Sequence, residues 1–274
     1  VILAEPHHNY GYTTQQRFAF CNVLEEVDGP GSWCFHRGTG RIYLWPPEGS
    51  GEPSAKPSAD LAVSVLREPM IRVREASHVC IEGIAFCESL GSGVVIEASE
   101  DVCVSGCTFT QLGNTAVEVE GTRNRVNSCD FQDLALGAIN VDGGDRATLT
   151  PGDNHIDNNH IHDFSRWIRT YQYAVGVDGV GQRITHNLVH DAPQEAMRFA
   201  GNEHLFEFNE IHSIVKETGD SGAIHTGRDW TWRGTVLRYN LIHGLAGGGL
   251  HGAMGIYLDV FMSVTVVEGN IFCH

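Results

Sequence analysis

The feature that most constrains this chain is an internal repeat that begins near residue 71. Each repeat contains a short β-branched strand, a Gly, Asp or Asn turn, a second strand, and then a small residue two places before an apolar one. A period of roughly 20 to 30 residues is typical of a solenoid, in which each repeat forms one coil that stacks on the next. The last element of the repeat recurs as Ile84-Ala85-Phe86, Cys107-Thr108-Phe109, Cys129-Asp130-Phe131, Asn159-His160-Ile161, Asn187-Leu188-Val189, Asn209-Glu210-Ile211, Asn240-Leu241-Ile242 and Asn270-Ile271-Phe272.

A second ladder aligns independently on the preceding strand of each repeat. Its apolar residues alternate with a period of two, which points them into the coil and the residues between them outward. The inward pairs are Val94 and Ile96, Val117 and Val119, Ile139 and Val141, Val175 and Val177, Met197 and Phe199, Ile224 and Thr226, and Ile256 and Leu258. The outward residues are Val95, Glu118, Asn140, Gly176, Arg198, His225 and Tyr257.

The repeat length indicates the handedness of the solenoid. The shortest coil is longer than the roughly 18 residues of a left-handed hexapeptide helix, and parallel crossovers favour the right hand. The 32 glycines suit a chain with many tight turns. We therefore predict an all-β fold, a right-handed parallel β-helix of about eight coils over residues 71–274.

The first 70 residues differ in character from the repeat. Strand-like sequence from Trp33 to Pro47 surrounds a turn at Gly38 to Gly40, which predicts a β-hairpin. We expect residues 1–70 to form an N-terminal hairpin and cap segment, joined to the first coil by the Gly, Pro and Ser-rich stretch from Pro46 to Pro57. The chain starts without Met and stops within a repeat, so we expect it to be a piece of a longer protein.

The stacked Asn and His residues have a structural interpretation. Asn tolerates the bend between two strands, and its amide can bond to equivalent amides in neighbouring coils. The repeat also propagates turn histidines, so we predict no metal site and no cofactor. The histidines in question are His162, His190, His212 and His243.

Four cysteines fall on two rungs of the predicted coils. Cys107 and Cys129 share an inward rung, which predicts buried free thiols. Cys80 and Cys103 share an outward rung, where both a disulfide and free thiols are open alternatives.

The formal net charge of −16 limits the classes of partner. It would repel nucleic acid and anionic membrane surfaces, and no stretch approaches the roughly 18 apolar residues of a membrane span. We expect a polysaccharide or oligosaccharide partner, no nucleic acid and no membrane. We also expect a secreted or extracellular protein whose signal peptide is not in the chain; the repeat specifies neither the sugar nor the oligomeric state.

Groups suited to chemistry are densest between about residues 195 and 259. Arg198, His225 and Tyr257 would line one outward face on consecutive coils. Carboxylates on neighbouring coils are what glycoside hydrolysis requires, one as general acid and the other as nucleophile or as base for water.

Four segments together resemble right-handed β-helix glycosidases, closest to glycoside hydrolase family 141. The segments are the Trp33–Pro47 hairpin, the Asn-x-Ile-His repeats, Glu217-Thr218-Gly219-Asp220-Ser221-Gly222-Ala223 and Gly255-Ile256-Tyr257-Leu258-Asp259. The resemblance covers nearly the whole chain. It implies hydrolysis of plant cell-wall sugars, with α-L-fucosidase and xylanase activities known in the family and two Asp residues as the catalytic pair. The matching positions are Asp220 and Asp259.

The catalytic pair sets a condition on the backbone. Asp220 precedes its strand and Asp259 follows the next one, so straight strands would hold the two more than about 20 Å apart. The chain from Gly219 to Gly222 must therefore fold back over the groove. If it does not, Asp229 is the alternative partner of Asp259.

The remaining candidates have two interpretations each. Asp220 could be a turn residue, and Asp259 a strand-end residue like Asp142 and Asp178. Packing competes with sugar stacking for Trp230. A structural ladder competes with a sugar-binding face for Arg198, His225 and Tyr257. The predicted substrate-binding set is Arg198, His225, Arg228, Asp229, Trp230 and Tyr257.

Two other functions are open at this point. A polysaccharide lyase or epimerase on the same fold would use Arg198 and Arg228 to neutralise an acidic sugar, although the sequence has no compact calcium loop. A non-catalytic carbohydrate-binding or structural rod is the other alternative. We favour a glycoside hydrolase that acts on a fucosyl- or xylosyl-containing polysaccharide.

Overall fold

The computed structural model describes residues 18, 20–46, 62–248 and 250–273. Contacts between backbone positions divide the chain into two compact units, Val1–Leu61 and Ala62–His274. Each unit is described here by itself.

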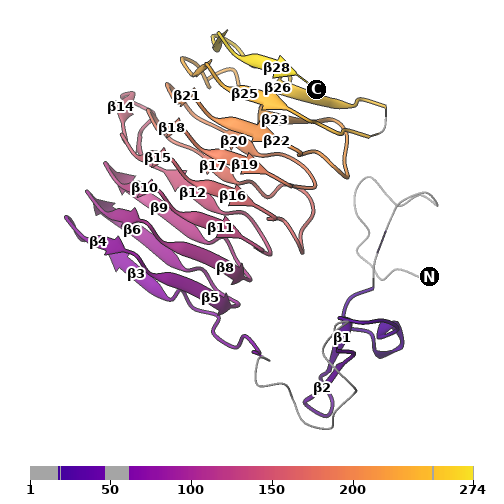
Figure 1. The fold of residues 1–274 in the computed structure, drawn as a ribbon. Coiled ribbons are helices and arrows are strands. Elements are labelled where there is room, and N and C mark those ends of the chain that lie inside the picture. Colours follow the sequence, from indigo (N-terminus) through magenta and orange to yellow (C-terminus); the bar gives the residue numbers. More distant parts are fainter. Residues whose placement is uncertain (1–17, 19, 47–61, 249, 274) are drawn as a thin grey trace. The chain divides into compact units, whose positions relative to one another are not determined.

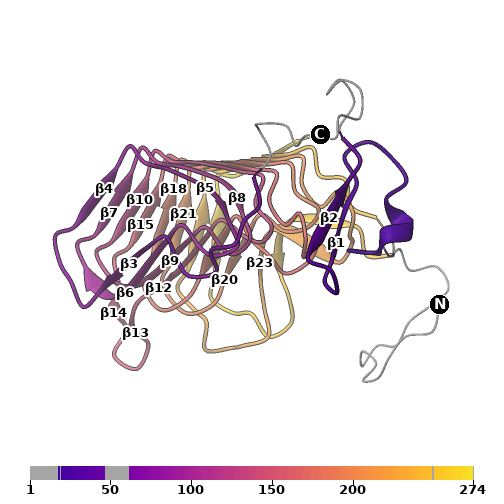
Figure 2. The same ribbon diagram turned by 90° about the horizontal axis from the view of Figure 1, so that it is seen from below.

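The second unit is a parallel β-helix of eight coils. It contains three sheets of eight strands, and each coil contributes one strand to each sheet (Figure 1). Strands that are equivalent in successive coils lie in rows, as β4, β7 and β10 do (Figure 2). The predicted all-β coil architecture is therefore confirmed.

The three sheets follow the order of the coils. The first, called the β3–β26 sheet, contains β3 (Ile71–Arg74), β6 (Val94–Glu100), β9 (Val117–Thr122), β12 (Ile139–Asp142), β17 (Val175–Val177), β20 (Met197–Phe199), β23 (Ser221–Thr226) and β26 (Ala253–Leu258). The second contains β4 (Cys80–Glu82), β7 (Cys103–Ser105), β10 (Arg125–Asn127), β15 (His155–Asp157), β18 (Arg183–Thr185), β21 (Leu205–Glu207), β24 (Val236–Arg238) and β27 (Val266–Glu268). The third contains β5 (Ala85–Ser89), β8 (Thr108–Leu112), β11 (Asp130–Gln132), β16 (His160–His162), β19 (Leu188–His190), β22 (Glu210–His212), β25 (Leu241–His243) and β28 (Ile271–Cys273).

Two short hairpins complete the described elements. One, β13 (Gly144–Asp145) and β14 (Thr150–Pro151), is inserted in the fourth coil. The other lies in the N-terminal unit, where β1 (Trp33–His36) pairs antiparallel with β2 (Arg41–Leu44) after the short 3-10 helix η1 (Leu24–Glu26). The predicted hairpin is confirmed, whereas most of the predicted linker, residues 47–57, lies outside the described residues.

In the core, residues at equivalent positions of successive coils stack on one another. Val94, Val117 and Ile139 are fully buried partners on adjacent strands of the β3–β26 sheet. On another face of the coil, the ring of Phe109 stacks between those of Phe86 and Phe131, with centroids 4.8 and 4.7 Å away. Because each inward side chain contacts its equivalent in the next coil, the apolar ladder read from the sequence gives the observed register.

The Asn residues form the expected amide ladder. Each Nδ2 donates to the Oδ1 of the next coil, at 2.9 Å from Asn159 to Asn187, 3.0 Å from Asn187 to Asn209 and 2.9 Å from Asn209 to Asn240. These side chains are buried, so the ladder satisfies polar groups that would otherwise be costly to remove from water.

The His residues also form a column. Rings stack at 4.9 Å from His162 to His190, 4.8 Å from His190 to His212 and 4.9 Å from His212 to His243. Within the described ranges, no group of three or more His, Cys, Asp or Glu side chains has an arrangement that could hold a metal ion.

The four rung cysteines are all free thiols. Cys107 and Cys129 are buried as predicted, and burial raises the pKa of Cys129 to about 12. Cys80 and Cys103 are paired in register on β4 and β7 without a disulfide. Among the described residues, no helix is long and apolar enough to cross a membrane.

Candidate functional site

The candidate site lies where β23 and β26 run side by side in the β3–β26 sheet. His225 and Tyr257 are paired in register, and their outward rings stack with centroids 4.7 Å apart and planes 9° from parallel. Arg198 is the register partner of His225 on β20. The structure therefore places these three predicted residues on consecutive coils of one face.

The chain before β23 bends back toward Tyr257. At Gly222, a Cβ atom would lie only 2.7 Å from the Cβ of Tyr257, so a larger residue would not fit there. The N–H of Asp220 donates to the carbonyl of Gly252 at 2.9 Å, and Asp220 has a φ of 55°. As a result, the Tyr257 hydroxyl donates to Oδ1 of Asp220 at 3.0 Å. This arrangement brings Asp220 to Tyr257, which stands two residues before Asp259 in the chain.

Asp259 follows β26 and has two fixed donors. Its Oδ1 accepts from the N–H of Val260 at 2.7 Å, and its Oδ2 accepts from Nε of Arg228 at 3.3 Å. The Val260 N–H and the Arg228 guanidinium hold the pKa of Asp259 below its ordinary value, although partial burial opposes them. Asp259 therefore remains ionised in mildly acidic solution.

The hydroxyl of Tyr257 lies near both carboxyl groups. Its pKa is raised, first by the hydrogen bond to Asp220, then by burial and by the charge of Asp259. Tyr257 is thus a neutral hydrogen-bond donor between the two aspartates at ordinary pH.

The structure adds Glu195, which the sequence interpretation missed. Its side chain is 1% exposed, and its Oε1 accepts from Nδ1 of His225 at 2.7 Å and from the hydroxyl of Ser221 at 3.4 Å. The available signal was its position, because Glu195 precedes inward-facing Met197 by two residues on the way into β20. An acidic residue at an inward position deserves attention because charged groups are rarely buried without a partner.

The three other predicted binding residues lie in the loop after β23. Arg228 is exposed and binds Asp259, whereas the carboxylate of Asp229 accepts from the N–H and the hydroxyl of Thr231, at 2.8 and 2.6 Å. Trp230 is 68% exposed, and its ring stacks on Phe261 at 5.1 Å. Asp229 is therefore held in its own turn, and the open indole of Trp230 is the group in this loop suited to stack on a sugar.

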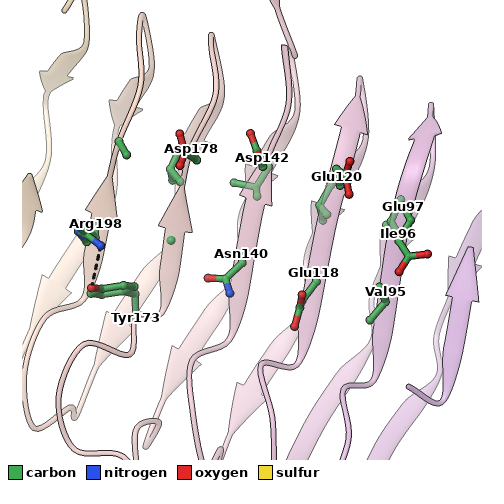
Figure 3. A pocket seen from close by; sticks show the side chains of 15 residues that line it. Val95, Ile96, Glu97, Glu118, Glu120, Asn140, Asp142, Tyr173, Asp178 and Arg198 are labelled. Atoms are coloured by element: carbon green, nitrogen blue, oxygen red, sulfur yellow. Dashed lines mark hydrogen bonds between the residues drawn. The ribbon is translucent and has the colours of Figure 1, made fainter. Parts of the chain in front are cut away.

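A groove lies on the same sheet and shares only Arg198 with this site, since Asp220, His225, Tyr257 and Asp259 do not line it. It has a volume of about 410 Å³ and crosses strands β6, β9, β12, β17 and β20 (Figure 3). Arg198 and Tyr173 lie together at one end, where Nη1 of Arg198 donates to the Tyr173 hydroxyl at 3.4 Å. The polar residues of the lining are Glu97, Glu118, Glu120, Asn140, Asp142, Tyr173, Asp178 and Arg198.

The groove is acidic along most of its length. Burial raises the pKa of Glu118, and burial together with the charges of Asp178 and Glu120 raises the pKa of Asp142. Glu97 differs, because its ion pairs with Arg74 and Arg72 lower its pKa. The groove therefore carries closely spaced carboxyl groups that, when ionised, would repel a bound anion.

Comparison with known proteins supports the fold. A family model described as a right handed beta helix region matches residues 69–172. A solved structure titled "Glycoside hydrolase" is similar over 91% of this chain and 57% of that chain, with 17% sequence identity and a TM-score of 0.69. A second, titled "Siphovirus 9NA tailspike receptor binding domain", has 14% identity and a TM-score of 0.33 over 74% of this chain and 45% of that chain. A search of curated proteins finds no match.

These findings define the class of protein. The chain is a right-handed parallel β-helix protein with an N-terminal hairpin, and its fold resembles that of a glycoside hydrolase. It spans little more than half the length of that structural neighbour.

Proposed function

We propose that this protein is a glycoside hydrolase that acts on a complex polysaccharide containing fucosyl or xylosyl units, with Asp220 and Asp259 as its catalytic pair. The observation that carries the proposal is the placement of the Tyr257 hydroxyl, which binds Asp220 and lies near Asp259. Two carboxyl groups gathered around one hydroxyl can flank a glycosidic bond.

The two aspartates can take different catalytic roles. Asp259 has a lowered pKa, which suits the carboxylate that attacks the anomeric carbon or removes a proton from attacking water. Asp220 then acts as the general acid and gives its proton to the glycosidic oxygen as the bond to the anomeric carbon breaks. Tyr257 holds one oxygen of Asp220, so the other oxygen can carry that proton.

The surrounding side chains suit a sugar ligand. The stacked rings of His225 and Tyr257 and the exposed indole of Trp230 offer apolar faces and hydrogen-bonding edges. The groove on the same sheet crosses five strands, and this length can hold further sugar units. A polysaccharide of this kind occurs outside the cell, and we propose an extracellular location on that ground.

The acidic groove disfavours the lyase or epimerase alternative. A polyuronate would bring carboxylates beside Glu118, Glu120 and Asp142, where like charges repel. Of the two arginines that could neutralise such a substrate, Arg228 is already paired with Asp259. A neutral glycan meets neither obstacle.

The experiment is hydrolysis of neutral plant polysaccharides by the wild type, Asp220→Asn and Asp259→Asn. Each substitution should lower kcat by at least about 100-fold. Asp133→Asn is a matched control, because Asp133 is half-buried, shares the φ of 55° with Asp220, and follows β11 of the third sheet, where it pairs with Arg166. Unsaturated products from polyuronates would favour the lyase, and glycan binding without hydrolysis would favour the non-catalytic rod.

A further inference from the structure

Glu195 is the most deeply buried carboxylate near the candidate site. Its Oε1 has two donors, whereas its Oε2 has no hydrogen-bond partner among the described residues. Burial of a carboxylate destabilises the fold, because the group loses its hydration, unless hydrogen bonds or an opposite charge compensate for that loss. Its partners therefore indicate what it does.

Both hydrogen-bond partners of Glu195 are connected to Asp220, one along the chain and the other through Tyr257. Ser221, which donates to Oε1 at 3.4 Å, is the residue directly after Asp220 and begins β23. His225, which contributes the second hydrogen bond, stacks on Tyr257, whose hydroxyl in turn binds Asp220. Oε1 of Glu195 thus accepts from the hydroxyl of the residue after Asp220 and from the ring that stacks on Tyr257, the hydrogen-bond donor of Asp220.

The hydrogen bond from His225 also determines which nitrogen carries the proton. A carboxylate oxygen can only accept, so Nδ1 must be the donor. In the neutral ring, Nε2 is then an acceptor, and it has no hydrogen-bond partner among the residues that the structure describes. A fixed tautomer of this kind is how carboxylates orient histidines in enzyme sites.

We infer that Glu195 is a positioning residue, which fixes the Nδ1–H tautomer and ring plane of His225 and thereby holds Tyr257 against Asp220. Nε2 of His225 is left to accept a hydrogen bond from a sugar hydroxyl. This inference rests on the proposed function for its consequence in catalysis. The orientation of His225 and Tyr257 can be measured without any activity.

The test compares Glu195→Gln with Glu195→Leu. The amide oxygen of Gln can still accept from Nδ1, whereas Leu removes the acceptor. In ¹⁵N NMR spectra, His225 should keep its Nδ1–H tautomer in Glu195→Gln and lose it in Glu195→Leu. The pKa of Tyr257, followed by ultraviolet titration, should fall toward its ordinary value only in Glu195→Leu, because the hydrogen bond to Asp220 is lost.

Kinetics give the second readout. With a hydrolysed glycan, Glu195→Leu should lower kcat about 100-fold with little change in KM, as expected when a reacting group is misplaced by about 1 Å. Glu195→Gln should retain most of the wild-type kcat. Glu210→Leu is the matched control, because Glu210 also accepts from a histidine, His243 at 3.2 Å, but lies on the third sheet.

The outcomes separate this inference from the proposed function. If Glu195→Leu folds with the His225 tautomer and the Tyr257 titration unchanged, the positioning role is overturned. If both change as expected while the wild type hydrolyses no glycan, the positioning role stands and the proposed function fails. Should Glu195→Leu not fold, Glu195→Asp retains the charge and withdraws the acceptor by about 1.5 Å, so it should show the same loss of tautomer.

Discussion

Tyr257 donates a hydrogen bond to Asp220 at 3.0 Å, although the two residues are 37 positions apart in the chain. The contact exists because β23 and β26 are paired in register and the backbone at Gly222 packs closely against Tyr257. The contact links Asp220, directly before β23, to Tyr257 in β26, the equivalent strand of the next coil. The proposed chemistry depends on it.

Removal of the Tyr257 hydroxyl should reduce activity more than stability. Tyr257→Phe keeps the ring that stacks on His225 but leaves Asp220 without its donor. We expect kcat to fall about 10- to 100-fold and the free energy of unfolding to change by about 1 kcal/mol, the usual worth of one hydrogen bond. Tyr239→Phe is the control, since Tyr239 is 49% exposed and stacks on Phe208 in another sheet. Equal kcat values for the two variants would contradict this expectation.

The bend at Gly222 should not tolerate a side chain. A Cβ there would lie 2.7 Å from the Cβ of Tyr257, so Gly222→Ala should destabilise the fold by about 1 to 3 kcal/mol and displace Asp220. Gly29→Ala provides the comparison, because no atom lies within 4 Å of the position its Cβ would take. Urea unfolding of both variants measures the difference. A Gly222→Ala protein with wild-type stability and activity would show that the bend is not tightly packed.

The buried imidazole of His204 predicts a loss of stability in acid. Burial lowers its pKa from 6.5 to about 4, so the folded state disfavours its charged form. An unfolded chain takes up the proton below pH about 6.5, and stability should therefore decline as the pH falls from about 6.5 to about 4. The shift corresponds to about 3 kcal/mol for this group.

The measurement for His204 is urea unfolding across that pH range for the wild type and His204→Gln. In the folded protein, His204 accepts from the N–H of Gln182 and its Nε2 contacts the carbonyl of Ala200. The substitution should lower stability at pH 7.5 and flatten its pH dependence. The same slope in both proteins would assign the acid sensitivity to other groups, such as the His column.

The Asn ladder should contribute measurably to stability. Nδ2 of Asn209 donates to Ile184 and Asn240, and its Oδ1 accepts from Asn187, all within the buried turn. Asn209→Ala would leave these groups unpaired, and we expect a cost of about 2 to 4 kcal/mol. Asn140→Ala, at an exposed outward position of β12, should change stability by less than about 0.5 kcal/mol. Comparable thermal shifts for the two variants would argue against the ladder.

Much of the fold could be predicted because the same pattern of inward and outward residues recurs in successive coils. The alternation around Val117 and Ile139 fixed which residues face inward, and the same alternation placed Arg198, His225 and Tyr257 on one outward face. Such ladders depend on local periodicity, which a single sequence displays.

The details of the site depend on contacts between coils, which periodicity does not display. The bend at Asp220 requires a hydrogen bond to Gly252, a residue of the next coil. Glu195 is not among the outward residues that the repeat aligns, because its spacing from Met197 places it at an inward position. The groove was missed because Tyr173, which lies in the long loop before β17, encloses one end.

The most direct measurement is a crystal structure of the Asp220→Asn variant with an oligosaccharide bound. We predict a glycosidic bond between residue 220 and Asp259, beside the Tyr257 hydroxyl, with the side-chain amide of residue 220 and the carboxyl group of Asp259 about 5 to 10 Å apart. A glycan bound elsewhere on the coil surface, or a bound glycan that contacts only one of residues 220 and 259, would contradict the proposed catalytic pair.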